Sequence, residues 1–312
     1  MISKSFAGTA AGLVAAITYG LNPLFALPLQ AEGMDTVSIL FYRYLLAIPI
    51  VGLMMVTRGR TFRVGLRQMW LLLLMGVLMG LSSLLLFESY RMMDAGIAST
   101  LLFVYPLMVA VIMGSLFGER MGLTTWVCLL AATVGIALLY NGEEGAAPLS
   151  FTGTMAVMAS ALCYAIYIVG VNKTSLSRLP TLTVTFYCLL TGLLVFVAYS
   201  LGKSTPIASP AGASQWLRVG ALALLPTAVS LTCTTMAISY VGSTVTAILG
   251  AMEPVTAVVI GISVFGERLT INDVAGLVMI VASVTMVVLG GSIGRHMTRI
   301  RKMLPPRRRV RK

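Results

Sequence analysis

Apolar residues along this chain arrive in blocks of about twenty, the length that a helix needs to cross a bilayer, separated by short polar breaks. Each block therefore predicts one membrane-spanning helix. The predicted spans of the first half are Ala7–Leu29, Thr36–Val56, Leu66–Ser89, Ala95–Phe117 and Leu123–Tyr140, and those of the second half are Gly153–Val171, Leu182–Leu201, Leu217–Ile238, Thr244–Phe265 and Val274–Leu289. The pattern predicts an all-α integral membrane protein with ten transmembrane helices.

Two other membrane-related interpretations fit the pattern poorly. The strands of a membrane β-barrel alternate apolar and polar residues, whereas the run from Trp70 to Leu86 is apolar on every helical face. A removed signal peptide would have an apolar core of only about 7–15 residues. The first block is longer and contains Asn22 and Pro23, so we keep it as a span.

Composition supports a protein that folds in lipid. Apolar residues make up 58% of the chain and charged residues 10%, against roughly 45–50% and about 25% in soluble domains. The only histidine is His296, in the basic C-terminal segment, and the cysteines, none spaced as a metal or redox motif, are Cys128, Cys163, Cys188 and Cys233. We therefore expect no cofactor, no metal site and no enzymatic activity.

The net charge of +12 is concentrated at predicted loops and at the C-terminus. Nine of the 22 basic residues lie between Arg295 and Lys312. A cytoplasmic N-terminus would place seventeen basic residues on the cytoplasmic side and four outside, so the positive-inside rule predicts both termini in the cytoplasm, with the chain in the cytoplasmic (inner) membrane. Residues 291–312 are interpreted as a topology anchor that can contact anionic lipid rather than nucleic acid.

An internal repeat relates residues 1–140 to residues 151–290. The matching segments are Phe6–Thr9 with Phe151–Thr154 and Phe41–Tyr42 with Phe186–Tyr187, at a shift of 145, and Pro106 with Pro254 and Phe117–Arg120 with Phe265–Arg268, at a shift of 148. Because five spans is an odd number, the second unit must be inverted relative to the first, with residues 141–150 as an external linker. Inverted repeats give alternating access a physical basis.

The segments Ser89–Gly122 and Ser239–Thr270, together with the arginine of the Phe41–Tyr44 sequence FYRY, resemble the paired domains of EamA-type drug/metabolite transporters. The resemblance implies ten helices, a central substrate cavity and a secondary transporter that moves amino acids or other small metabolites, with export as the expected direction. A membrane-embedded sensor or interaction protein, using this fold without net transport, is the alternative.

Glu253 is the candidate site residue that lies deepest in a predicted span. It falls near the bilayer midplane, where a charged side chain costs about 2.5–3.5 kcal/mol on insertion scales, and the adjacent Pro254 removes a backbone donor. Glu253 either lines a substrate cavity or is a protonated acid that only fixes packing. Its repeat counterpart, Tyr105, keeps the proline but not the acid.

Arg43 and Glu88 lie at depths that would let them meet. One hypothesis is a structural Arg43–Glu88 ion pair, because a paired charge in a membrane costs less than a lone one. The other is direct contact between Arg43 and the substrate.

Interrupted helices in transporters often border the substrate site, and Asn22-Pro23 interrupts the first span. Tyr19 lies one turn earlier, and its repeat counterpart is Tyr164. These tyrosines either line an amphipathic cavity or serve packing and interfacial anchoring, and the same alternatives hold for Tyr42, Tyr90, Tyr105 and Tyr187.

Two further motifs predict structure. The repeated Gly-Glu-Arg, at Gly118–Arg120 and Gly266–Arg268, is interpreted as a helix-ending turn on opposite sides of the membrane. Gly76 and Gly80 form a GxxxG spacing that indicates close helix packing. This packing is either within the chain or at a homodimer face.

Overall fold

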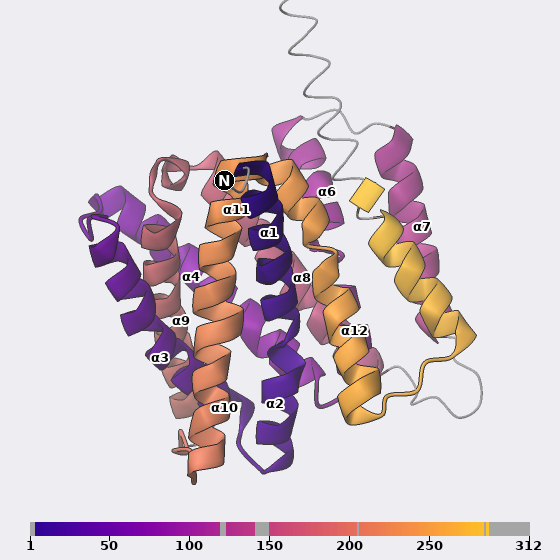
Figure 1. The fold of residues 1–312 in the computed structure, drawn as a ribbon, viewed down its shortest axis with the longest axis horizontal. Helices are drawn as coiled ribbons and strands as arrows, with labels where there is room; N and C mark the ends of the chain where they lie inside the picture. Colours follow the sequence, from indigo (N-terminus) through magenta and orange to yellow (C-terminus); the bar gives the residue numbers. More distant parts are fainter. Residues whose placement is uncertain (1–3, 119–122, 141–149, 205, 284, 287–312) are drawn as a thin grey trace, which may run out of the picture.

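The computed structural model describes residues 4–118, 123–140, 150–204, 206–283 and 285–286, and every regular element among them is helical (Figure 1). The helices are α1 (Lys4–Gly20), α2 (Asn22–Ala31), α3 (Thr36–Thr57), α4 (Leu66–Ser89), α5 (Ala95–Leu102), α6 (Tyr105–Phe117), α7 (Leu123–Tyr140), α8 (Phe151–Lys173), the 3₁₀ turn η1 (Ser175–Arg178), α9 (Thr181–Lys203), α10 (Ala213–Ala223), the π-helical turn η2 (Leu224–Val229), α11 (Ser230–Leu249) and α12 (Met252–Phe265). A further helix covers Ile271–Ser283.

Seven helical segments of the described residues are long and apolar enough to cross a membrane. They are Lys4–Ala31, Thr36–Thr57, Leu66–Ser89, Ala95–Phe117, Phe151–Lys173, Thr181–Lys203 and Ala213–Thr234. Shorter apolar helices, at Trp126–Ile136, Met252–Phe265 and Ile271–Ser283, fall in or overlap the other three sequence-predicted spans. The chain is therefore a multi-pass, all-helical membrane protein.

Several of these segments are broken near their middle, next to proline. The α1–α2 segment is interrupted at Leu21, before Pro23. The α5–α6 segment is interrupted at residues 103–104, before Pro106, and α11 is separated from α12 at residues 250–251, before Pro254. A proline lacks an N–H donor and fits the first turn of a helix, so each half-helix begins beside its proline.

The chain reverses direction within the residues assigned to α11. A Cβ atom placed on Gly12 would lie 3.5 Å from the Cβ atoms of both Ala237 and Leu249, so these two atoms lie at most 7 Å apart, twice that distance. A straight helix would separate residues twelve positions apart by about 18 Å. The reversal lies between the predicted spans Leu217–Ile238 and Thr244–Phe265.

Corresponding helices of the two halves pack against each other's half in a reciprocal way. In one set of contacts α1 packs on α11 and α12, and in the other α8 packs on α4, α5 and α6, while α3 packs on α9 (Figure 1). Under the repeat alignment, α1 corresponds to α8, α6 to α12 and α3 to α9. The first span of each half therefore packs on the third and fourth spans of the other half.

Small residues bring α4 close to α8 and α9. A Cβ atom on Gly76 would lie 2.5 Å from Thr191 Cβ, and one on Gly80 would lie 3.1 Å from Gly192 Cα. The GxxxG spacing thus serves a contact within the chain. On the side of α4 that faces α8, Ser82 Oγ lies 3.0 Å from both the carbonyl oxygen and the Oγ of Ser160. Ser160 Oγ donates in turn to the Ser82 carbonyl at 2.7 Å.

Large apolar side chains also cover the outside of the bundle. Leu53, Trp70, Leu116 and Leu217 are exposed by 65%, 68%, 75% and 73%. Such a surface suits lipid rather than water. Arg120, the linker 141–149, His296 and the basic tail lie outside the described residues, so the predictions made for them stay predictions.

Candidate functional site

A largely enclosed cavity of about 20 Å³, large enough for one water molecule, lies among α1, α3, α4, α5 and α8. Its lining contains the polar side chains Tyr19, Arg43, Ser82, Ser83 and Tyr164, together with Met79, Leu86, Phe87 and Leu102. Tyr164 comes from the second half of the chain and the other lining residues from the first, with Tyr19 and Leu102 at the ends of α1 and α5 where these helices are interrupted. The cavity combines polar and apolar walls deep inside the bundle.

Arg43 is the cation of this cavity and is only 6% exposed. Its Nε donates to Thr227 Oγ1 at 3.1 Å, and its guanidinium carbon lies 5.4 Å from the centre of the Phe87 ring. Thr227 belongs to the π-helical turn η2, and its hydroxyl donates in turn to the Leu222 carbonyl at 3.1 Å. Both partners of Arg43 are neutral.

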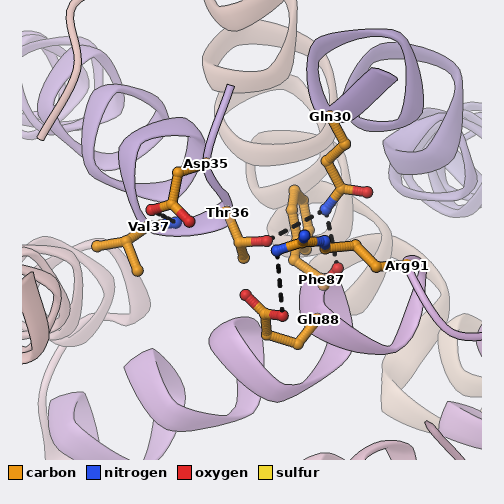
Figure 2. A network of polar contacts seen from close by, with 7 residues as sticks. All are labelled: Gln30, Asp35, Thr36, Val37, Phe87, Glu88 and Arg91. Atoms are coloured by element: carbon orange, nitrogen blue, oxygen red, sulfur yellow. Dashed lines mark hydrogen bonds and ion pairs between the residues drawn. The ribbon is translucent and has the colours of Figure 1, made fainter. Parts of the chain in front are cut away.

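The hypothesis of an Arg43–Glu88 ion pair is wrong for this structure. Glu88 lies near the C-terminal end of α4 and pairs with Arg91 across 3.8 Å (Figure 2). Nearby, Gln30 Nε2 donates to the Phe87 carbonyl at 2.9 Å. Leu86 and Phe87 are buried in the core, whereas the next residue, Glu88, is partly exposed. The rotation of about 100° between neighbouring helix residues separates the two directions.

Tyrosines connect the cavity to Glu253. Tyr19 lines the cavity together with Arg43, and the next residue, Gly20, lies against the backbone of Glu253. Tyr164 also lines the cavity, and its ring meets the Tyr105 ring edge-on at 4.7 Å between centroids. The Tyr105–Tyr164 contact between α6 and α8 corresponds, in the repeat, to the approach of Glu253 on α12 to Tyr19 on α1.

Glu253 itself lies beside the cavity and is not part of its lining. It occupies the first turn of α12, directly before the buried Pro254, where the partial positive charge of a helix N-terminus favours a carboxylate. The side chain is partly buried, and the described residues provide no hydrogen bond to its carboxylate. A Cβ atom on Gly20 would lie 2.6 Å from the Glu253 carbonyl oxygen, so α1 crosses α12 at this point.

Asn22 marks the start of α2 and is 2% exposed. Its Nδ2 donates to the Tyr19 carbonyl at 2.8 Å, which satisfies a backbone acceptor freed by the helix break. Its Oδ1 is buried without a hydrogen-bond partner. An unpartnered buried acceptor is costly, and here it lies two residues from the crossing of α1 with α12.

The glutamate of the second Gly-Glu-Arg segment binds the N-terminus of α5. Glu267 Oε1 and Oε2 accept from the backbone N–H groups of Ala95 and Gly96 at 2.9 and 3.3 Å, capping that helix from outside. Burial raises the pKa of the Glu267 carboxyl, against the effect of these two hydrogen bonds. Gly266, with φ of +68°, ends α12 in the left-handed conformation that favours glycine.

Comparison with known proteins gives the family. Residues 6–141 and 151–289 match the EamA-like transporter family. The chain belongs to the EamA-like transporter family. This EamA-like transporter is 28% identical over 278 residues to an uncharacterized transporter of Archaeoglobus fulgidus, covering 89% of this chain and 94% of the relative. It is also 28% identical over 219 residues to an uncharacterized transporter of Synechocystis, covering 68% and 64%. These relatives indicate a transporter rather than an enzyme.

A solved crystal structure shares the fold of this EamA-like transporter. The TM-score is 0.65 at 20% identity, and the match covers 90% of this chain and 96% of the other. At this identity the likeness concerns the fold alone.

Sequence reasoning missed several residues around Arg43. Thr227, Phe87, Ser82 and Ser83 carried no motif, and Thr227 lies 184 positions from Arg43. The one available signal was Pro226, a proline inside a predicted span. A proline there favours a local change of helix geometry, and this is where the π-helical turn forms.

Proposed function

We propose that this protein is a secondary transporter that moves small organic metabolites, amino acids or related amphipathic compounds, outward across the cytoplasmic membrane by alternating access. Its ten transmembrane helices form two inverted five-helix repeats, at residues 1–140 and 151–290, joined by an external linker at 141–150. Both termini face the cytoplasm, and the basic tail at 291–312 contacts anionic lipid.

The reciprocal packing of helices from the two halves supports a repeat. Span one of each half packs on spans three and four of the other, as a two-fold axis relating the two halves would require. The positions of the helix ends before the two Gly-Glu-Arg segments also support an inverted repeat. Glu267, just after α12, binds the start of α5, and the segment from Ala95 to Phe117 then extends about 34 Å away from it. The helices that precede the two Gly-Glu-Arg segments thus end at opposite ends of the bundle.

The enclosed cavity at Arg43 is the observation that carries the proposal. Residues of both repeats line it, so a change in how the repeats pack would open it toward one end or the other. At about 20 Å³ it is too small for a metabolite, as expected of an occluded state. Proline-broken helices at α1–α2, α5–α6 and α11–α12 supply the segments that can bend during this change.

Transport by purified protein tests this proposal. Liposomes loaded with pooled metabolites, with and without a proton gradient, are assayed by mass spectrometry for compounds that cross faster than through protein-free liposomes. We expect at least one amphipathic metabolite to cross, and Glu253→Gln to reduce its flux. The matched control is Glu32→Gln, which removes a carboxylate that pairs with Arg218 on the exposed end of the bundle and should leave the flux unchanged.

Two results would contradict the proposal. If no metabolite crosses under any gradient, the transporter function is wrong and the sensor or interaction protein becomes the better interpretation. If Glu253→Gln folds and transports like the unaltered protein at every pH tested, Glu253 has no part in the pathway.

A further inference from the structure

Helix α5 is capped by a residue from the other half of the chain. The first N–H groups of a helix have no partner within the helix, and an aspartate at the N-cap position commonly accepts from them. Asp94 occupies that position of α5, yet its side chain makes no capping hydrogen bond. Glu267, just after α12, instead accepts from the N–H groups of Ala95 and Gly96 at 2.9 and 3.3 Å. The structure therefore uses a distant cap where a local one is available.

Two glycines make room for the Glu267 carboxylate between α5 and α12. A Cβ atom on Gly261 would lie 2.5 Å from the carboxyl carbon of Glu267, and the three nearest side-chain atoms all belong to that carboxylate. A Cβ atom on Gly96 would lie 3.0 Å from Glu267 Oε2 and 3.1 Å from the Cα atom of Val258. A larger residue at Gly261 would therefore displace the carboxylate. The backbones of α5 and α12 approach closely where Glu267 joins them.

The Glu267 contact lies at one end of two half-helices. Helix α5 runs from this contact to the break at residues 103–104, and α12 runs to it from the break at residues 250–251. Leu102, the last residue of α5, lines the cavity about 10 Å along the helix axis from Ala95. Helix α12 packs on α1 and on α5, while α5 also packs on α8, so the contact joins the set of helices around α1 to the set around α8. A bend at either break that moves α5 away from α12 must first release this contact.

We propose that Glu267 holds the outer end of the substrate pathway closed in this structure, and that Asp94 takes over the cap of α5 when that end opens. The inference rests on the proposed transporter function and makes Glu267 a positioning residue for transport. Withdrawal of Glu267 leaves the first N–H groups of α5 without an acceptor, which costs stability while they stay unpaired. Asp94 directly precedes these groups, so a rotation of its side chain supplies the replacement. Glu267 thereby favours the closed state and Asp94 the open one.

The side from which the cavity can be labelled tests this exchange of caps. Ser83→Cys, in a chain whose four native cysteines are replaced, is treated with a membrane-impermeant thiol reagent in right-side-out and in inside-out vesicles. The quantity measured is the labelling ratio, the labelling rate from outside divided by the rate from the cytoplasmic side. This ratio is compared between Ser83→Cys alone and Ser83→Cys combined with Glu267→Gln, Gly261→Ala, Asp94→Ala or Asp94→Asn.

The variants should move the labelling ratio in opposite directions. Glu267→Gln keeps one acceptor oxygen but loses the charge, and Gly261→Ala displaces the carboxylate. Both should raise the ratio by roughly tenfold, the effect expected when a hydrogen bond to a charged group is weakened. Asp94→Ala removes the replacement cap of the open state and should lower the ratio, whereas Asp94→Asn retains a capping oxygen and should leave it near the value of Ser83→Cys alone.

A cap with a structural role alone would behave differently. Its loss in Glu267→Gln would lower the thermal unfolding midpoint and leave the labelling ratio unchanged. Asp35→Ala is the matched control for such a role, because Asp35 caps its own helix, α3, by accepting from the Val37 N–H at 3.0 Å. This control should lower the midpoint without changing the ratio.

Failure of this inference can be told from failure of the proposed function. If pooled metabolites cross the liposomes while folded Glu267→Gln or folded Gly261→Ala leaves the labelling ratio unchanged, the role of Glu267 is wrong and the transporter stands. A change of the ratio by Asp94→Ala in the same direction as by Glu267→Gln would overturn the exchange of caps. If nothing crosses and Ser83→Cys is labelled from neither side, the transporter function fails, and this inference fails with it.

Discussion

Gly192→Ala tests how closely α3, α4 and α9 pack beside the cavity. A Cβ atom at Gly192 would lie 2.6 Å from Tyr44 Cε2 and 3.1 Å from its Cδ2, well inside van der Waals contact. The Tyr44 ring cannot withdraw easily, because it is 2% exposed, meets Phe196 edge-on at 5.0 Å and holds Ser83 through its hydroxyl. Overpacking of this kind typically costs about 1–3 kcal/mol.

Gly202→Ala is the matched control, because Gly202 lies on the same helix and a Cβ atom there meets nothing within 4 Å. Both substitutions gain up to about 1 kcal/mol of helix propensity. The difference between the variants therefore isolates the overpacking, roughly 1–3 kcal/mol or several degrees in the unfolding midpoint. Thermal unfolding in detergent at one heating rate measures it. Equal midpoints for Gly192→Ala and Gly202→Ala would refute the close approach of Tyr44 to α9.

The remaining predictions concern topology, the Glu267–α5 contact and the charges. Cysteines at Phe117 and Arg268, positions that avoid the positive-φ residues Gly118 and Gly266, should be labelled from opposite sides of the membrane; labelling of both from one side would contradict the inverted repeat. Burial raises the pKa of the Glu267 carboxyl above its usual value of 4.5, so ionising this group destabilises the folded state as the pH rises. The unfolding midpoint of the unaltered protein should therefore fall with rising pH, and that of Glu267→Gln should fall less. Identical dependence of the midpoint on pH in the two proteins would count against this role of Glu267. Since Arg43 and Glu88 do not touch, the stability losses of Arg43→Ala and Glu88→Ala should add in the double variant, whereas a coupling above about 0.5 kcal/mol would revive the ion pair.

Much of the fold follows from the sequence, because lipid imposes simple rules on helix length and polarity. The apolar blocks predicted the helical segments, and Pro23, Pro106 and Pro254 lie beside the three breaks. Proline alone is an ambiguous signal, however. Pro49 lies inside α3 without interrupting it, since neighbouring helices and local adjustments can accommodate the missing hydrogen bond.

The partners within the site could not be predicted, because depth along a span does not determine rotation about the helix axis. Arg43 and Glu88 have compatible depths, yet Glu88 turns toward Arg91 and the Arg43 side chain meets Thr227 from the other half of the chain. The GxxxG spacing likewise identified a contact surface and left its partner open until α9 was placed against it.

Access to the cavity from the two sides of the membrane tests alternating access most directly. Ser83→Cys, in a chain whose four native cysteines are replaced, puts one thiol on the cavity wall. A membrane-impermeant thiol reagent is applied to right-side-out and to inside-out vesicles, with Ser263→Cys on the exposed surface of α12 as the lipid-facing control. Alternating access predicts that Ser83→Cys is labelled from both sides, at rates that a transported metabolite changes, while Ser263→Cys is labelled from neither. Labelling of Ser83→Cys from only one side, or from neither, under every condition would contradict it.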